Sequence, residues 1–124
     1  MLAAEQRRFA ELFRGTPVVF STQSDGSLRV ELPLQYCFDA ARSSVKPPLA
    51  AVLERLARSQ QNEYTRLVVT APADPNAKAL ALGTERAASA RDYLVARGVA
   101  LDRLSISAVA RGPVRVVVAD ATVP

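Results

Sequence analysis

The chain has 124 residues and a formal net charge of +4, with 49% hydrophobic and 23% charged residues, which is typical of one folded domain and excludes a disordered chain. It contains no histidine and a single cysteine, so histidine-based catalytic triads, histidine metal sites and a disulfide within the chain are excluded. It also has no Gly-rich phosphate loop and no paired-carboxylate motif, so we expect neither catalysis nor a cofactor.

The N-terminal residues 2–13 are predicted to form a short amphipathic helix, because Phe9, Leu12 and Phe13 recur at helical spacing before Gly15. This charged stretch lacks the apolar core of a secretion signal, and no run of about 18 apolar residues is long enough to span a membrane. We therefore expect no transmembrane segment, and either a cytoplasmic protein or a piece of a longer exported one.

A β-hairpin is predicted around Asp25 and Gly26, which separate two strand-like stretches. The second strand is expected over residues 28–38, because apolar residues alternate along one face: Leu28, Val30, Leu32, Leu34, Tyr36 and Phe38. Pro33 predicts that this strand lies at a sheet edge or is broken by a bulge there. The alternation directs Cys37 away from the apolar face, where we expect a small packed thiol.

The remaining pattern predicts a helix, a strand, a helix and two strands, over residues 49–59, 67–72, 83–97, 104–108 and 114–118. The second of these helices has a small buried stripe of Ala87, Ala90 and Leu94, which allows a close approach to a sheet. The order predicts an α+β two-layer sandwich, in which two helices pack on one face of a mixed sheet. We expect a single domain, with residues 1–27 as an N-terminal helix and first hairpin strand and residues 28–120 as the core.

Two charged residues are candidates for a binding site. Arg86 is predicted in the first turn of helix 83–97, where the helix dipole disfavours a cation. Either Glu85 offsets this effect and Arg86 is solvated, or Arg86 and the free N–H groups bind an anion. Asp74 is either a plain turn residue or shares a hollow with Arg86, since the preceding strand ends near that helix start. An open pair of this kind suits a small zwitterion, whereas a mutual ion pair would close the hollow and remove the basis for a binding site shared by the two charges.

Five stretches together carry a resemblance to a known family: LRVELPLQYCFD at 28–39, VKPPL at 45–49, LVVT at 67–70 with Asp74, LGTERA at 82–87 and YLVARGV at 93–99. They resemble the OmpA-like C-terminal domain, the peptidoglycan-associating module of Gram-negative envelope proteins. The resemblance covers about residues 28–118, and the helix start is its most specific part.

The resemblance implies a non-catalytic domain that anchors a larger outer-membrane or envelope protein to the cell wall from the periplasm. In that family an aspartate and an arginine hold the diaminopimelate of the peptidoglycan stem peptide, and the matching positions are Asp74 and Arg86. Arginine would take the ligand's carboxylate and aspartate its ammonium, with Asp39 and Thr70 as rim contributors. The implied partners are peptidoglycan and other envelope proteins, with no metal and no nucleic acid.

Departures from the family pattern keep a second hypothesis open. Before the aspartate the family usually has Gly-His-Thr, where this sequence has Ala71-Pro72-Ala73, and the usual Tyr-Asn pair is replaced by Lys78-Ala79. A degenerate OmpA-like domain would then act as a structural or protein-interaction module without wall binding. A third hypothesis, a basic nucleic-acid binder, is disfavoured because the arginines are scattered rather than grouped.

Overall fold

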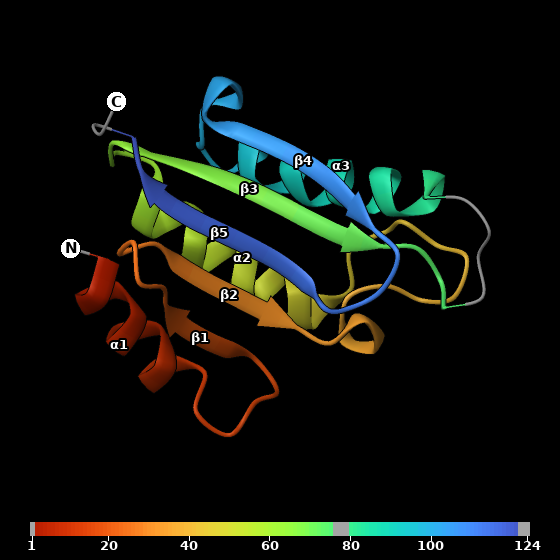
Figure 1. Ribbon diagram of the computed structural model, residues 1–124, viewed down its shortest axis with the longest axis horizontal. Coiled ribbons are helices and arrows are strands. Elements are labelled where there is room, and N and C mark those ends of the chain that lie inside the picture. Colours follow the sequence, from red (N-terminus) through yellow and green to blue (C-terminus); the bar gives the residue numbers. More distant parts are fainter. Residues whose placement is uncertain (1, 76–79, 122–124) are drawn as a thin grey trace.

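The computed structural model describes residues 2–75 and 80–121 (Figure 1). Its elements are, in chain order, α1 (Leu2–Leu12), β1 (Val19–Thr22), β2 (Leu28–Leu32), the 3-10 helix η1 (Leu34–Tyr36), α2 (Pro47–Gln60), β3 (Thr65–Pro72), α3 (Ala81–Ala96), the 3-10 helix η2 (Leu101–Arg103), β4 (Leu104–Val109) and β5 (Val114–Asp120). None of the helices within these ranges is long and apolar enough to cross a membrane.

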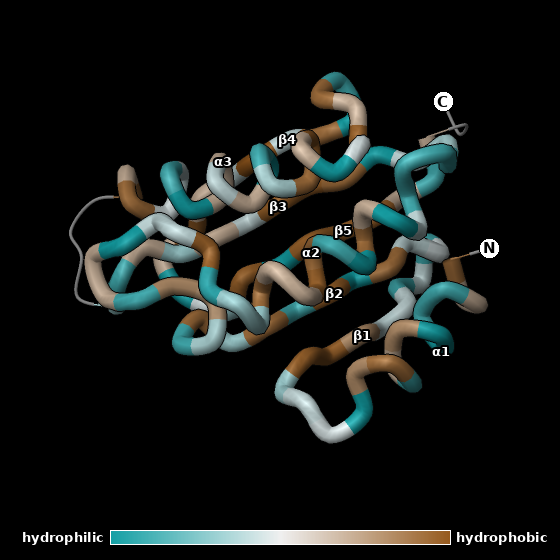
Figure 2. Tube along the Cα trace, turned by 180° about the vertical axis from the view of Figure 1, so that it is seen from behind, coloured by the Kyte–Doolittle hydropathy of each residue, from teal (hydrophilic) through white to brown (hydrophobic). Residues whose placement is uncertain are grey.

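The strands form one sheet in the order β1-β2-β5-β3-β4, in which β3 and β4 are parallel and every other neighbouring pair is antiparallel. Figure 2 shows α2 and α3 side by side over one face of this sheet, with α1 beside β1 at the edge. The predicted α+β sandwich, with a mixed sheet and two helices on one face, is therefore confirmed.

The predicted hairpin is present between β1 and β2, which pair antiparallel from Thr22 opposite Leu28. Asp25 Oδ1 accepts hydrogen bonds from the Ser27 backbone N–H at 2.9 Å and from the Ser27 hydroxyl at 2.6 Å. Gly26 has a φ of +87°, a left-handed conformation that glycine adopts without steric cost. These local contacts fix the register that directs the alternate residues of β2 toward the helices.

The second predicted strand is shorter than expected. β2 ends at Leu32, and after Pro33 the chain turns into η1, so the strand stops at the proline instead of continuing past a bulge, and the extension to residue 38 is wrong. The position of β2 inside the sheet also corrects the edge placement. Because η1 ends the alternation, Cys37 points into the core, contrary to its predicted direction, and its Sγ lies 3.5 Å from the Pro33 carbonyl oxygen.

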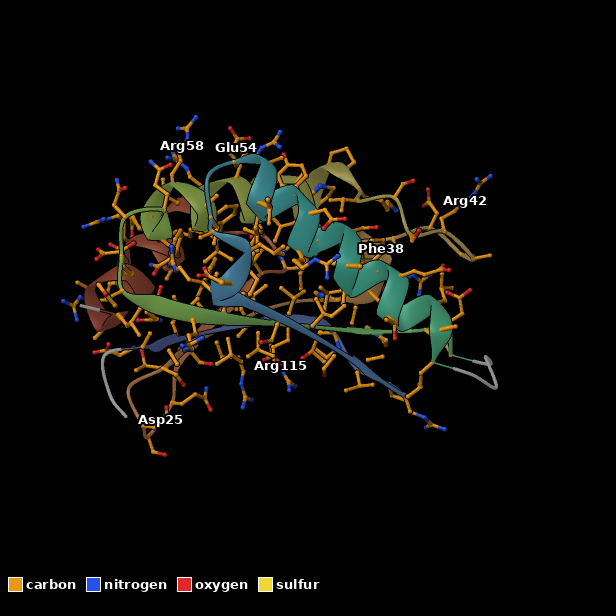
Figure 3. The ribbon with its side chains drawn as sticks, turned by 90° about the horizontal axis from the view of Figure 1, so that it is seen from above. Asp25, Phe38, Arg42, Glu54, Arg58 and Arg115 are labelled. Carbon is orange, nitrogen blue, oxygen red and sulfur yellow. The ribbon has the colours of Figure 1, made fainter. Side chains whose placement is uncertain are left out.

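The core lies between the sheet and the two helices. Its strand residues alternate as predicted and include Leu28, Val30, Leu32, Leu67, Val69, Val114, Val116 and Val118. α2 adds Leu49, Val52, Leu53 and Leu56, and α3 adds the predicted small stripe of Ala87, Ala90 and Leu94. No helix of the described residues covers the opposite face of the sheet, and Figure 3 places Arg115 there, where its Nε donates to Glu31 at 3.0 Å.

α3 approaches the sheet so closely that Gly83 has no room for a side chain. A Cβ at this position would lie 2.8 Å from the Ala71 carbonyl oxygen and 3.1 Å from the Ala73 backbone nitrogen. Gly83 therefore lets the first turn of α3 rest directly on the end of β3. The helix begins at Ala81, two residues earlier than predicted, which places Arg86 in its second turn.

Candidate functional site

Arg86 lies inside the molecule, with no exposed surface, at the junction of α3, the end of β3 and the loop that precedes α2. Its guanidinium makes four hydrogen bonds: from Nε to the Arg42 carbonyl at 2.8 Å, from Nη1 to the Pro72 carbonyl at 3.1 Å, and from Nη2 to the Asp39 carbonyl at 3.1 Å and to Asp74 Oδ1 at 2.7 Å. One side chain thus joins three segments that are distant in the sequence.

Asp74 is the anionic partner of Arg86, and we call the two residues the charge pair. Its other oxygen, Oδ2, accepts a hydrogen bond from the Ala41 backbone N–H at 2.8 Å. Ala41 has a φ of +60°, so this loop adopts a left-handed turn that presents its N–H to the carboxylate. The hydrogen bond from Arg86, followed by that from Ala41, holds the pKa of Asp74 below its ordinary value of 3.8.

The two members of the charge pair differ in their access to solvent. The Asp74 side chain is 31% exposed, whereas that of Arg86 is fully buried. Arg86 also lies over the ring of Phe38, with 5.4 Å between its Cζ and the ring centroid, which is within the range of a cation–π contact. A ligand can therefore reach the carboxylate in this arrangement, while the guanidinium is enclosed by the protein.

The prediction that Asp74 and Arg86 lie together is confirmed by their 2.7 Å contact. The predicted open hollow between two free charges is wrong, because Asp74 and Arg86 pair with each other. Arg86 is neither solvated nor directed at a free anion site, and Glu85 is exposed instead of bonded to it. The helix dipole also disfavours Arg86 less than expected, because the dipole acts mainly on the first turn and Arg86 lies in the second.

The two predicted rim residues lie at different distances from the charge pair. Asp39 contributes its carbonyl oxygen to Arg86, while its carboxylate pairs with Lys46 Nζ at 3.1 Å. Thr70 lies on the face of the sheet opposite to α3, and its hydroxyl oxygen is 3.5 Å from that of Ser107. The structure therefore brings Asp39 to the charge pair and leaves Thr70 away from it. Lys78 and its neighbour Ala79 lie outside the described residues.

A pocket of about 410 Å³ opens at the same end of the sheet as the charge pair. We call it the β3-end pocket; it is lined by Leu34, Pro72, Ala73, Pro75, Ala110, Arg111 and Gly112. Figure 1 shows the turn between β4 and β5 beside the end of β3, and this neighbourhood forms the pocket. Pro72 lines the β3-end pocket and also contacts the charge pair, because its carbonyl oxygen accepts a hydrogen bond from Arg86.

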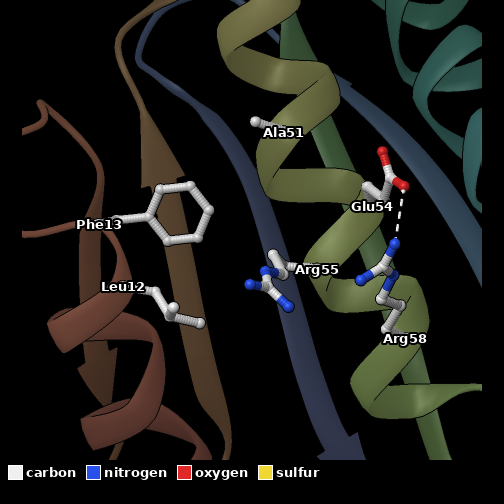
Figure 4. Close-up of a pocket in the computed structure, with 6 residues that line it drawn as sticks. All are labelled: Leu12, Phe13, Ala51, Glu54, Arg55 and Arg58. Atoms are coloured by element: carbon white, nitrogen blue, oxygen red, sulfur yellow. Dashed lines mark hydrogen bonds and ion pairs between the residues drawn. The ribbon is translucent and has the colours of Figure 1, made fainter.

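A second hollow of about 350 Å³ lies between α1 and α2 and does not include the charge pair. Figure 4 shows Leu12 and Phe13 on one side and Arg55 on the other. Arg58 pairs with Glu54 along the rim at 3.4 Å. Sequence reasoning found neither hollow, because each is formed by segments that only the tertiary fold brings together.

No family model matches the sequence, and no curated protein matches it. Solved structures do match. The cell wall anchor of the T6SS from Pseudomonas aeruginosa is 18% identical, with 92% of this chain and 95% of that chain covered and a TM-score of 0.77. The periplasmic domain of Helicobacter pylori MotB is 18% identical, with 86% and 83% covered and a TM-score of 0.68.

The OmpA-like domain of FopA1 from Francisella tularensis is 13% identical, with 83% of this chain and 79% of that chain covered and a TM-score of 0.63. The chain has an OmpA-like fold. At these low identities the comparison establishes the fold alone, and it confirms at that level the resemblance found in the sequence. The charge pair of this OmpA-like fold joins the end of β3 to α3.

Proposed function

We propose that this OmpA-like fold is a non-catalytic anchoring domain that binds peptidoglycan in the periplasm and attaches a larger envelope protein to the cell wall. The observation that carries the proposal is the partly exposed Asp74 carboxylate, which is held in place at the end of β3 by Arg86 and the Ala41 N–H. The similarity to a cell wall anchor and to a periplasmic domain supports the same function.

The ligand that best fits Asp74 is an ammonium group, such as that of diaminopimelate in the stem peptide. A carboxylate offers about four lone-pair positions, and each oxygen of Asp74 uses one of them within the described residues. The unused positions are available to a cation on the solvent side. One such charge-assisted bond contributes about 1.5–3 kcal/mol, so a single site is weak and many sites along a polymer provide avidity.

The proposed roles differ from those that the resemblance implies. Arg86 cannot take a ligand's carboxylate while it is buried and bonded to four oxygen acceptors of its own chain. We therefore assign Arg86 to positioning: it holds Asp74 in one rotamer and keeps its carboxylate ionised. Asp74 is the group that contacts the ligand.

Cosedimentation with purified peptidoglycan sacculi tests the proposal. The Asp74→Asn substitution removes the charge with little change in size, and we expect about tenfold weaker binding. Asp92→Asn is the matched control, since Asp92 is an exposed carboxylate of α3 whose ion pair is with its neighbour Arg91. Unfolding curves of both variants separate loss of binding from loss of fold. A folded Asp74→Asn variant that sediments like the wild type would disprove the assigned site.

A second candidate function is a structural or protein-interaction module of an envelope assembly that does not bind the wall. The observation in its favour is that Arg86, the only charged residue without exposed surface in the described part of the chain, is fully used inside the molecule. Titration with a diaminopimelate-containing peptide, followed by amide NMR, separates the two candidates. Shifts at Ala41 and residues 73–75 support wall binding, whereas an unchanged spectrum supports the interaction module.

A further inference from the structure

A ligand that carries both an ammonium and a carboxylate needs a cation as well as Asp74. Arg86 is unavailable for this purpose, because its donors are directed at Asp74 and at three carbonyl oxygens. If Asp74 receives the ammonium, a different basic side chain at this end of the sheet must receive the carboxylate. The structure offers such a residue in the β3-end pocket.

Arg111 is the one charged residue among the described residues that line that pocket. It lies in the turn between β4 and β5, it is exposed, and it makes no ion pair or hydrogen bond with any residue in the described ranges. By contrast, Arg103 donates to Thr65, and Arg115 donates to Glu31. Arg111 therefore retains its full set of donors for a ligand, in the two-pronged geometry that suits a carboxylate.

The rest of the pocket suits the hydrocarbon part of a small ligand. Its other lining residues are apolar or small, and its volume of about 410 Å³ is within the range of small-molecule sites. Ala73 and Pro75, the chain neighbours of Asp74 on both sides, form part of its wall. Pro72 lines the pocket and also bonds to Arg86, so the pocket adjoins the charge pair.

We propose that Arg111 binds a carboxylate of the peptide whose ammonium group contacts Asp74, and that the β3-end pocket holds the methylene chain between the two charges. This inference rests on the proposed function. It assigns the binding of the ligand's carboxylate to Arg111 in the β4–β5 turn instead of Arg86 in α3. The ligand class is an amino-acid or peptide carboxylate attached to a short aliphatic chain.

An alternative cation at the charge pair is Arg42, in the loop that precedes α2. Figure 3 shows its side chain directed away from the body of the protein, and it does not line the pocket. Only its backbone carbonyl takes part in the site, through the bond from Arg86. Arg42→Gln keeps that carbonyl and removes one charge at the same end of the molecule, which makes it a matched control for Arg111→Gln.

The test is calorimetric titration with two probes: a diaminopimelate-containing peptide and the same peptide with its carboxylates converted to primary amides. We expect amidation to weaken binding to the wild type and to Arg42→Gln by about tenfold, the equivalent of one charge-assisted bond. Arg111→Gln should bind the unmodified peptide about tenfold more weakly than the wild type and should not distinguish between the two probes.

The outcomes separate this inference from the function on which it depends. If the wild type binds the peptide and amidation weakens Arg111→Gln as much as the wild type, Arg111 is not the carboxylate ligand and the proposed function stands. If the wild type binds neither the peptide nor sacculi, the proposed function and this assignment are both wrong. Because Arg111 is an exposed turn residue that bonds to no side chain in residues 2–75 and 80–121, we expect its substitution to leave the unfolding curve unchanged.

Discussion

Arg86 is the largest fully buried side chain among the described residues, and a guanidinium cannot lose its proton to relieve the cost of burial. Its charge is balanced by Asp74, and its remaining bonds go to backbone carbonyls that would otherwise lack this donor. Removing the arginine would leave several of these acceptors unsatisfied at once. The residue is therefore a strong determinant of stability as well as a support for the site.

We expect Arg86→Met to lower the free energy of unfolding by about 3–5 kcal/mol, because one partner of a buried pair is removed while the other remains. Urea unfolding followed by circular dichroism measures the change. Arg58→Met is the control, since the Arg58 side chain is 66% exposed on α2 and its loss should change stability by less than about 0.5 kcal/mol. Equal stability of both variants would contradict the role assigned to Arg86.

The pKa of Asp74 predicts how stability depends on pH. Its pKa is lowered in the folded state, first by Arg86 and then by the Ala41 N–H, so the carboxylate stabilises the fold at pH values above its ordinary pKa of 3.8. This contribution is lost as the pH falls through the folded-state pKa. We expect the stability advantage of the wild type over Asp74→Asn to shrink below pH 3.8.

Urea midpoints measured from neutral pH down to about pH 3 provide the comparison. Asp25 also has a lowered pKa, through its bonds to Ser27, but it is present in both proteins and its effect cancels. If the two proteins lose stability in parallel over this interval, Asp74 is not the group that couples the fold to protonation.

The reactivity of the Cys37 thiol measures how readily the loop after η1 opens in solution. Burial raises the pKa of its thiol to about 12, and thiol reagents attack the thiolate. We expect labelling of the native protein near pH 8 to be slow, and to become fast in denaturant, where the thiol is exposed at its ordinary pKa. Labelling of the folded protein at the rate of the unfolded chain would show that the loop after η1 is open in solution.

At the scale of elements, Gly83 controls the contact between α3 and the sheet. Alanine favours a helix over glycine by about 1 kcal/mol, so propensity alone predicts that Gly83→Ala stabilises the protein. The structure predicts the opposite, because the added Cβ would lie 2.8 Å from a backbone oxygen of Ala71 that cannot move cheaply. We expect a loss of about 1–3 kcal/mol in urea unfolding.

Ser89→Ala provides the matched control on the same helix. Ser89 is only partly buried, and its replacement by a better helix former should leave stability equal or slightly higher. If Gly83→Ala also stabilises the protein, the close approach of α3 to β3 is wrong.

The elements that sequence analysis predicted well are those in which one face is buried against the other layer. The alternation in β5 and the small stripe of α3 are of this kind. The predictions are wrong where one residue interrupts the regular spacing of apolar residues. Pro33 ends β2, so the apolar residues after it lie in the 3-10 helix η1 or directly follow it, as Cys37 does. α3 also begins at Ala81 instead of Gly83, because Gly83 lies within the first turn and packs against the end of β3.

For the site, the sequence left Asp74 either as a plain turn residue or as a neighbour of Arg86, and it did not decide whether the two residues pair. The decisive acceptors are the backbone carbonyls of Asp39, Arg42 and Pro72, and any residue type at those positions supplies such a group. Whether an arginine side chain is exposed or buried depends on where the surrounding backbone carbonyls lie, and residue types alone do not reveal those positions. The pocket around Arg111 depends in the same way on a turn that the fold places beside β3.

At the scale of the whole molecule, α1 and β1 form a small unit at one edge of the sheet. Phe9 stacks on Phe20 with 5.4 Å between the ring centroids, and Phe13 approaches the same ring at 5.6 Å. Gln6 Nε2 donates to the Phe20 carbonyl at 3.1 Å, which ties the helix to the strand. The charge pair and the β3-end pocket lie in the remaining layers, which residues 28–120 supply.

We propose that residues 28–120 form the core of a single domain and that residues 1–27 stabilise it from outside. A chain that begins at Leu28 should still unfold cooperatively in urea, with a free energy of unfolding lower by about 3–5 kcal/mol, because the nearly fully buried Phe9 and its aromatic partners are lost. Phe9→Ala in the full chain should cause a loss of similar size. The shortened chain should keep the pH dependence conferred by Asp74, since the partners of that carboxylate in the described residues are Arg86 and Ala41, and both are retained. A shortened chain without a cooperative transition would show that α1 and β1 belong to the folding core itself.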